Sequence, residues 1–436
     1  MPNNNIRYYI FWIIDIFKGL KVYRHFKEIE TIQNHYSSDK SIDLRQSYIN
    51  NLLSHATSTT IFYNNYKGLG ITEFPVINKN TIRNNKAQFR SSEFEKKQMK
   101  HVSTSGSTGT SISLYHDKNK SNRNIADNIF FYKLADYKIG QKLYYLRIWL
   151  FSISTFKMWL KNFKPIDVLR FNEEKYISNL VKELGSGKSS KNILSYASAL
   201  EKLCVYLDSN NYSPFPNSKV KSVISIAEHL NDYTRERMDY YFNTKVYSRY
   251  SNSENGILAQ QVINSESDFV INWASYYIEI LKLDSDNAAE EGETGRIVVT
   301  DLFAYGIPII RYDTGDLGSI DYSKPIPVFK KVEGRKSDVI LNTKGEMVSS
   351  MIIIRPHINK GVVQSQLIQE GEKKYTLNLN VTEEFKDESE IRDEFIFFLG
   401  EDAQINIEYT NEIPALASGK TRATINNYIK PTIKVN

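Results

Sequence analysis

Apolar runs alternate with amphipathic stretches through the middle of the chain, and this alternation limits the possible folds more than any other feature. The apolar runs are short and rich in β-branched and aromatic residues, which is typical of buried strands. The stretches between them carry apolar residues at helical spacing. The expected strands are 142–152, 223–226, 246–250, 276–283 and 297–300, and the expected helices are 194–208 and 227–242. This order predicts an α/β fold, preceded by a mostly helical segment over residues 1–95.

The pattern changes near Gly334. Residues 375–381 and 405–409 alternate between apolar and polar positions, whereas 387–399 carry apolar residues at helical spacing. Together they predict a separate α+β domain of about 100 residues, a common size for a small domain. We therefore expect a large N-terminal domain with layered α/β sheets over 1–334 and a small C-terminal domain over 335–436.

Composition excludes several classes of protein. The 436 residues are enough for two or three domains, and 41% hydrophobic with 24% charged residues is ordinary globular composition. The net charge is +6, but Lys and Arg are spread among the acids, so we expect no nucleic-acid partner. The single cysteine, Cys204, excludes a disulfide framework and a Cys-rich zinc site. Because Cys204 shares helical spacing with Leu200, Leu203 and Leu207, we expect it to be a core thiol.

An apolar stretch near the N-terminus, Tyr8–Ile14, is followed by Asp15 and Ile16–Phe17. It is too short to span a bilayer, which needs ~20 apolar residues, and it lacks the cleavage site of a signal peptide. Two interpretations remain open: peripheral membrane contact through residues 7–20, or a helix packed on the protein itself. We expect a cytoplasmic protein, with the inner face of the membrane as the alternative. The flanking residues are basic and would suit anionic lipid: Arg7, Lys18, Lys21 and Arg24.

Residues 103–111 form a run of hydroxyl side chains and glycines. The run cannot contribute to a core, and its residue types favour turns over helices. Backbone N–H groups in such a turn can bind an anion, and the hydroxyl groups add donors. A flexible surface loop is the competing interpretation, and the run lacks the Gly-Lys-Ser/Thr ending of a Walker loop. The candidate phosphate-binding residues are Thr104, Ser105, Gly106, Ser107, Thr108 and Gly109.

Four further stretches carry candidate site residues. Glu254, in the segment 250–256 after an expected strand, could hold Mg²⁺, although a solvated loop acid is the alternative. Asp316, in 310–317, could accept hydrogen bonds from a ribose diol, although Asp-Thr-Gly-Asp also makes a good β-turn. Arg335 stands where the pattern changes, and Lys420 follows a glycine in 414–422. Each stretch alone is a weak signal.

Together the five stretches resemble the motifs of the adenylate-forming superfamily, which includes acyl-CoA synthetases, luciferases and peptide-synthetase adenylation domains. The order of the motifs matches that family from Thr104 to Lys420. Within it, the chain is most similar to the phenylacetate–CoA ligase branch and its CapK-like group, which is tied to capsular polysaccharide biosynthesis. The stretches that support the branch are 52–63, 74–79, 226–228 and 295–302.

The chain departs from the family pattern at several positions. Ser251 and Ser253 replace a glycine and a threonine, and Ser111-Ile112 stand where Pro-Lys often follows the hydroxyl loop. Phosphate neutralisation is therefore expected to depend more on Lys420 and Mg²⁺. The hinge pivot falls on Ser337 or Asp338, because this segment has one extra residue.

The resemblance implies a role for each matching residue. The hydroxyl loop would wrap the β- and γ-phosphates of ATP, and Glu254 would hold Mg²⁺. Asp316 and Arg335 would grip the ribose, and Lys420 would be the catalytic residue that bridges the substrate carboxylate and the α-phosphate. The acyl pocket is expected near Ile226. The remaining cofactor-binding positions are Ala227, Glu228, Tyr250, Ser251, Asn252 and Ser253.

The implied activity has two half-reactions. A carboxylic acid attacks the α-phosphate of ATP to give acyl-AMP and pyrophosphate, and an acceptor then attacks the acyl carbon and releases AMP. The acceptor is CoA in one hypothesis, which makes the chain an acyl-CoA ligase. In the alternative hypothesis the acceptor is an amino sugar or another amine. A third hypothesis is a catalytically silent binding protein that kept the fold, and a homodimer is left open.

Overall fold

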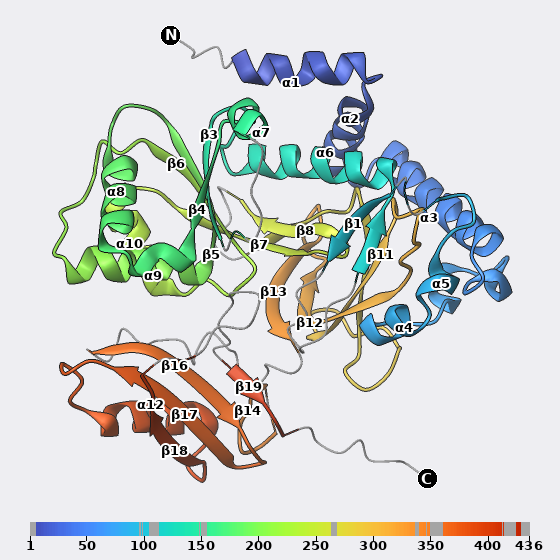
Figure 1. The fold of residues 1–436 in the computed structure, drawn as a ribbon. Coiled ribbons are helices and arrows are strands. Elements are labelled where there is room, and N and C mark those ends of the chain that lie inside the picture. Colours follow the sequence, from blue (N-terminus) through green and yellow to red (C-terminus); the bar gives the residue numbers. More distant parts are fainter. Residues whose placement is uncertain are drawn as a thin grey trace. The chain divides into compact units, whose positions relative to one another are not determined.

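The computed structural model describes residues 6–95, 97, 99–103, 113–147, 149, 155–262, 268–335, 340–345, 347–348, 361–411, 413 and 424–428 (Figure 1). The chain divides into two compact units. The first comprises Met1–Ala227 and Arg237–Val332, and the second comprises Glu228–Glu236 and Glu333–Asn436.

The first unit is organised around an eleven-stranded mixed sheet. Its strands are β3 Lys142–Arg147, β4 Phe163–Asp167, β5 Lys191–Tyr196, β6 Val220–Ile226, β7 Val246–Asn252, β8 Gly256–Gln261, β9 Phe269–Ile271, β10 Tyr276–Leu281, β11 Gly295–Asp301, β12 Tyr312–Asp321 and β13 Val328–Arg335. Their order is β10-β11-β12-β13-β9-β8-β7-β6-β5-β3-β4. The strands from β4 to β7 pair in parallel, and the pairing becomes antiparallel between β7 and β8. The predicted α/β class is confirmed.

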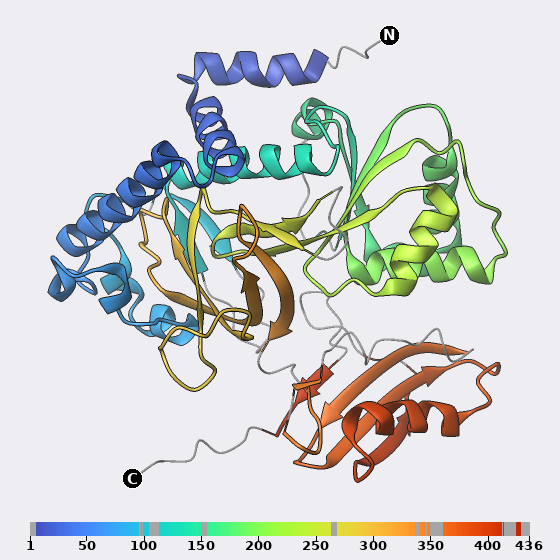
Figure 2. The ribbon, with the colours of Figure 1, turned by 180° about the vertical axis from the view of Figure 1, so that it is seen from behind.

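Helices cover this sheet and fill the N-terminal segment. Helix α9 contacts β5 and β6, whereas α6 contacts α2 and β8. Figure 2 shows α8, α9 and α10 gathered around the parallel strands. The helices of this part are α1 Ile6–Phe17, α2 Lys21–Asn34, α3 Asp39–Thr59, α4 Lys79–Asn84, α5 Lys86–Phe89, α6 Lys118–Leu134, α7 Thr155–Leu160, α8 Glu174–Gly185, α9 Ala197–Ser209 and α10 Asp232–Phe242, with 3-10 turns η1 Asn64–Tyr66, η2 Ile71–Glu73 and η4 Val168–Asn172. A small hairpin is formed by β1 Lys100–Ser103 and β2 Ser113–His116.

Several predicted boundaries need correction. The predicted helix 227–242 begins only at Asp232, and the predicted strand 276–283 ends at Leu281. The predicted helix 194–208 begins only at Ala197, because Leu194–Tyr196 belong to β5 and pair with β6. Apolar residues continue from a strand buried on both faces into the buried face of α9, so periodicity alone did not reveal the junction. The predicted strand 142–152 ends at Arg147, and most of its remainder lies outside the described residues. The buried free thiol of Cys204 is confirmed.

The second unit holds a four-stranded mixed sheet in the order β18-β17-β16-β19. Its elements are β16 Val362–Gln369, β17 Lys374–Val381, β18 Gln404–Tyr409, β19 Thr424–Asn426, α12 Glu388–Leu399 and the short pair β14 Ile340–Leu341 and β15 Met347–Val348. Helix α12 packs Ile391, Phe395 and Leu399 into one core with Leu377 and Leu379 of β17. The strands and the helix expected here are confirmed to within one residue. The division into domains 1–334 and 335–436 stays a prediction.

Candidate active site

The site begins at the carboxyl ends of β6 and β7, the last two parallel strands of the sheet. These strands run side by side, with Ile226 opposite Arg249. Ala227 follows β6 with a left-handed backbone (φ 75°), and Glu228 comes next. In open α/β sheets, ligands bind in the crevice outside the carboxyl ends of the strands. The topology therefore brings Ala227 and the predicted segment 250–254 to a sheet edge that suits a nucleotide.

A three-residue turn between β7 and β8 carries Glu254. The side chain of Asn252 accepts a hydrogen bond from the backbone N–H of Asn255 at 2.8 Å. The hydroxyl of Tyr276 donates to the carbonyl of Asn255 at 2.7 Å, and Nε2 of His116 lies 2.9 Å from the carbonyl of Glu254. These contacts fix the backbone of the turn on both sides of Glu254, so its side chain is held at this edge of the sheet.

The carboxylate of Glu254 is buried and paired. Glu254 is 3% exposed. Its Oε1 lies 3.0 Å from Nζ of Lys79 and accepts a hydrogen bond from the hydroxyl of Tyr312 at 3.1 Å. The alternative of a solvated loop acid is therefore wrong for Glu254. Lys79 was not predicted as a site residue, although it ends the segment 74–79 that supported the family branch.

Backbone pairing places Lys79 beside Glu254. The backbone N–H of Ile77 donates to the carbonyl of Arg311 at 3.0 Å, and that of Asp313 donates to the carbonyl of Ile77 at 2.7 Å. Arg311, which has a left-handed backbone (φ 50°), also donates to the carbonyls of Thr72 and Phe74 at 2.8 and 2.9 Å. The segment leading to Lys79 is thus fastened to the start of β12, next to Tyr312.

Asp316 lies in a β-bulge of β12. Thr314, Gly315 and Asp316 together stand opposite Ile297 of β11, where the register shifts. Gly315 has φ 78°, a backbone that side chains rarely adopt, and a Cβ there would meet no atom within 4 Å. The hydroxyl of Thr314 donates to the carbonyl of Ile297 at 3.0 Å and accepts from the N–H of Asp316 at 3.1 Å. The segment predicted as a motif or a β-turn is therefore a bulge that interrupts a long strand.

Tyr250 connects the two motifs. Its hydroxyl lies 2.7 Å from Oδ2 of Asp316, to which it donates, and 3.3 Å from Oγ1 of Thr314. Burial of the hydroxyl, together with the negative charge of Asp316, holds the pKa of Tyr250 well above its ordinary value. The phenol therefore stays protonated and orients one carboxylate oxygen of Asp316. Two predicted site residues from separate motifs are thus in direct contact.

Several predicted residues lie outside this description. Thr104–Gly109, Ser111-Ile112, Ser337, Asp338 and Lys420 are outside the described residues. Arg335 ends β13, but its side chain is not described. Ser251 and Asn252 belong to β7, and Ser253 begins the turn. Ala227 closes the first unit, whereas Glu228 opens the segment assigned to the second.

The residues present fit a nucleotide-bound magnesium ion. Across the described parts of the chain, no group of three or more His, Cys, Asp or Glu residues could hold a metal by itself. Mg²⁺ in nucleotide sites needs only one or two carboxylates, since phosphates and water complete its shell. Glu254 offers one such carboxylate, whose Oε1 is paired with the ammonium of Lys79 at 3.0 Å.

Comparisons with known proteins agree with this architecture. Residues 340–427 match the CapK C-terminal domain. Protein CapK of Staphylococcus aureus is 24% identical over 403 residues, covering 85% of this chain and 84% of its own length.

Solved structures share the fold. A 2-hydroxyisobutyryl-CoA ligase in the postadenylation state with 2-HIB-AMP superposes with a TM-score of 0.68 at 14% identity, covering 89% of this chain and 90% of that one. The same ligase with 2-HIB-AMP and CoA in the thioesterification state gives a TM-score of 0.55 at 15% identity, with coverage of 89% and 90%. ATP-bound MatB from Rhodopseudomonas palustris gives 0.55 at 15% identity, covering 74% and 66%. At these identities the structures show a shared fold alone.

Proposed function

We propose that this chain, which has the fold of the adenylate-forming superfamily, a CapK C-terminal domain and a distant homologue in Protein CapK, is an ATP-dependent carboxylate ligase. Its product would be an acyl-CoA, used in surface polysaccharide biosynthesis. The observation that carries the proposal is that two tyrosines donate hydrogen bonds to the carboxylates of two motifs. Tyr250 binds Asp316 and Tyr312 binds Glu254, at the edge where parallel strands end.

The first half-reaction is acyl adenylation. A carboxylate oxygen of the substrate attacks the α-phosphorus of ATP, the bond from that phosphorus to the bridging oxygen breaks, and pyrophosphate leaves. Negative charge gathers at the α-phosphorus, so the site must provide cations and hydrogen-bond donors in advance. In our proposal Lys420 provides the cation, and Thr104–Gly109 donate to the β- and γ-phosphates.

Asp316 would accept hydrogen bonds from the ribose hydroxyls, with Arg335 as a second contact. The hydroxyl of Tyr250 donates to Oδ2 of Asp316 and so orients this carboxylate. The acyl group would lie near Ala227 and Ser251, at the ends of β6 and β7. No side chain in this set specifies which carboxylic acid is used.

Glu254 would hold Mg²⁺ together with the phosphates. When bound, Mg²⁺ neutralises phosphate charge and orients the leaving pyrophosphate. The hydroxyl of Tyr312 and the turn contacts hold the carboxylate in place for this role.

The test is exchange of [³²P]pyrophosphate into ATP over a panel of carboxylic acids. We expect exchange with at least one acid, dependent on Mg²⁺ and lost with EDTA. Lys420→Ala should lower exchange by about 10²–10³, while transfer from chemically supplied acyl-AMP to the acceptor survives. Lys420→Arg should rescue poorly, because a planar guanidinium does not replace a compact ammonium. Absence of exchange with every acid, or normal exchange in Lys420→Ala, contradicts the proposal.

The second half-reaction distinguishes the acceptors. The thiol of CoA would attack the acyl carbon, and AMP would leave as a thioester forms. The ligase of the same fold that binds CoA supports this choice. An amino sugar would give an amide instead. Supplying acyl-AMP with CoA or with amino sugars, and identifying the product by mass spectrometry, decides between them.

A further inference from the structure

Helix α1 exposes an apolar face. Its members, which we call the α1 face, are exposed large hydrophobic residues: Ile6, Tyr9, Ile13, Ile16 and Phe17. At 3.6 residues per turn they fall within an arc of about 100°. Phe17, the last residue of the helix, is 86% exposed. An exposed apolar surface of this kind marks a site of contact with another molecule or with a membrane.

The opposite face of α1 is anchored to the protein. Trp12 packs edge-on against Tyr23 at 5.6 Å between ring centroids, and lies 5.9 Å from Phe26 of α2. Asp15 is buried, and its carboxylate accepts hydrogen bonds from the N–H groups of Val22 and Tyr23 at 3.1 and 2.8 Å. Figures 1 and 2 both show α1 at the margin of the first unit, beside α2. The α1 face is therefore presented outward by a fixed helix.

The exposed charges that follow α1 directly in the sequence are basic. Asp15 is the acidic residue of α1, and it is turned inward to cap α2. Lys18, Lys21 and Arg24 are exposed just beyond the helix. An apolar helix face with a basic border is the pattern of interfacial helices that bind anionic lipid.

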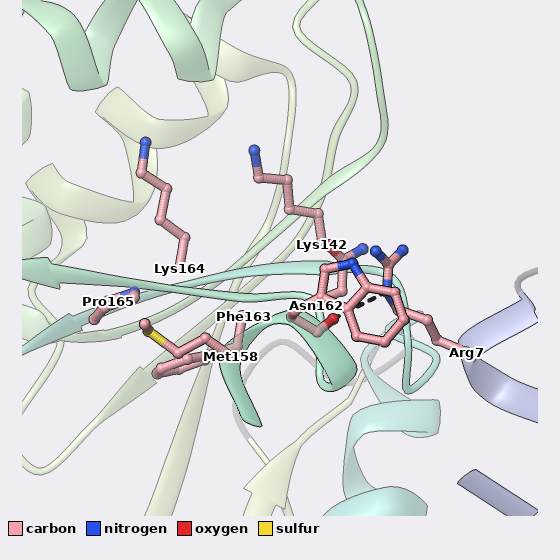
Figure 3. Close-up of a pocket in the computed structure, with 8 residues that line it drawn as sticks. Arg7, Lys142, Met158, Asn162, Phe163, Lys164 and Pro165 are labelled. Atoms are coloured by element: carbon pink, nitrogen blue, oxygen red, sulfur yellow. Dashed lines mark hydrogen bonds between the residues drawn. The ribbon is translucent and has the colours of Figure 1, made fainter. Parts of the chain in front are cut away.

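Helix α7 extends this surface beside the start of α1. The guanidinium of Arg7 donates to the carbonyl of Trp159 at 3.0 Å, and the ring of Trp159 is exposed. A cavity of about 300 Å³ opens here, and Figure 3 shows Arg7, Lys142 and Lys164 around it. Lys142 and Lys164 both pair with Glu183. Tryptophan is enriched where proteins meet the headgroup region of a membrane.

We propose that the α1 face and Trp159 dock this protein on a bilayer with anionic headgroups. The apolar side chains would enter the boundary between headgroups and acyl chains, and the basic residues would contact the headgroups. The contact is peripheral, since no helix in the described part of the chain is long and apolar enough to cross a membrane. The proposal does not depend on the ligase activity.

The test is flotation of the full chain with vesicles. One set is phosphatidylcholine alone, and the other contains phosphatidylglycerol as well. We expect binding to the anionic set that weakens with salt. Ile13→Ser with Phe17→Ser should abolish it, and Lys18→Gln with Lys21→Gln should lower partition by roughly fivefold per charge. Ile61→Ser is the matched control, because Ile61 is exposed elsewhere on the first unit. This variant should bind vesicles as the wild type does.

Circular dichroism melting must show that the variants remain folded. Fluorescence quenching by brominated phosphatidylglycerol should reach Trp159, and Trp159→Phe should remove that part of the quenching. The proposal is overturned if the wild-type chain floats with neither vesicle set. It is also overturned if the Ile13→Ser/Phe17→Ser variant binds as well as the wild type. Light scattering tests the competing occupant, a second copy of the chain. A wild-type dimer that becomes a monomer in Ile13→Ser/Phe17→Ser, with no vesicle binding, also overturns it.

Discussion

The ion pair between Lys79 and Glu254 predicts that replacing the lysine destabilises the fold more than replacing the glutamate. The Glu254 side chain is 4% exposed, whereas that of Lys79 is 24% exposed. Lys79→Met leaves a carboxylate buried without its cation, and breaking a buried pair in this way costs about 3–5 kcal/mol. Because Lys79 is partly solvated and Tyr312 still donates to Glu254, we expect about 2–3 kcal/mol.

Replacing the other partner, Glu254, should lower the free energy of unfolding by a smaller amount. Glu254→Gln keeps an oxygen that accepts from Tyr312, and the ammonium of Lys79 can turn toward water. We expect about 1 kcal/mol for Glu254→Gln, and a similar loss for the double variant, since it contains no unpaired buried charge. The difference between the single variants is thus a direct measure of how deeply the carboxylate is buried.

The assay is thermal unfolding of the single and double variants in the absence of nucleotide. In a domain of this size, 1 kcal/mol shifts Tm by about 1–2 °C, so Lys79→Met should lower Tm by about 2–6 °C. Lys40→Met, exposed on α3, is the matched control. A double variant as unstable as Lys79→Met, or equal losses from the two single variants, would refute the reasoning.

Three further predictions concern the bulge, the ribose contact and a surface ion pair. Gly315 and Gly292 both have φ 78° and open surroundings. Gly315→Ala and Gly292→Ala should therefore each lower the free energy of unfolding by about 1–2 kcal/mol in urea. Only Gly315→Ala should also weaken ATP binding in calorimetry. Asp316→Ala should lower ATP affinity by about 1.5–3 kcal/mol with the fold intact, and unchanged affinity removes Asp316 from the site. Burial would raise the pKa of Glu183, but hydrogen bonds from two lysines and a tyrosine lower it to about 2; the stabilisation is therefore present above the ordinary pKa of 4.5 and lost as pH falls toward 2. Glu183→Gln should cost about 1 kcal/mol at pH 7, after allowing for solvent screening, with a difference from wild type that shrinks between pH 5 and 2 in unfolding titrations.

The sequence predicted the class of the fold because local patterns carry it. Residues 223–226 were predicted as a buried strand from their apolar and β-branched residue types alone, and they lie in β6. The junction at Tyr196 was missed because a strand buried on both faces and the buried face of a helix share apolar residues. The order of strands in the large sheet was not predictable from local pattern, since it depends on pairing between distant segments.

The site shows the same division between local and distant information. Glu254, Tyr250 and Asp316 were found from motifs, but the hydrogen bond between Tyr250 and Asp316 joins residues 66 positions apart. Lys79 carried no signal of its own, because a lysine at the start of a short helix is ordinary on a protein surface. Its importance comes from the backbone pairing of Ile77 with the start of β12, which no local pattern records.

The burial of Glu254 explains why the chain needs that pairing. The Glu254 side chain is only 4% exposed, so little water reaches its carboxylate, and an unpaired charge there is costly. The ammonium of Lys79 lies 3.0 Å from Oε1 of Glu254 and balances this charge. The segment 74–79, far in sequence from every motif acid, is therefore part of the site's charge balance, and an account limited to the motifs leaves Glu254 without a counter-charge.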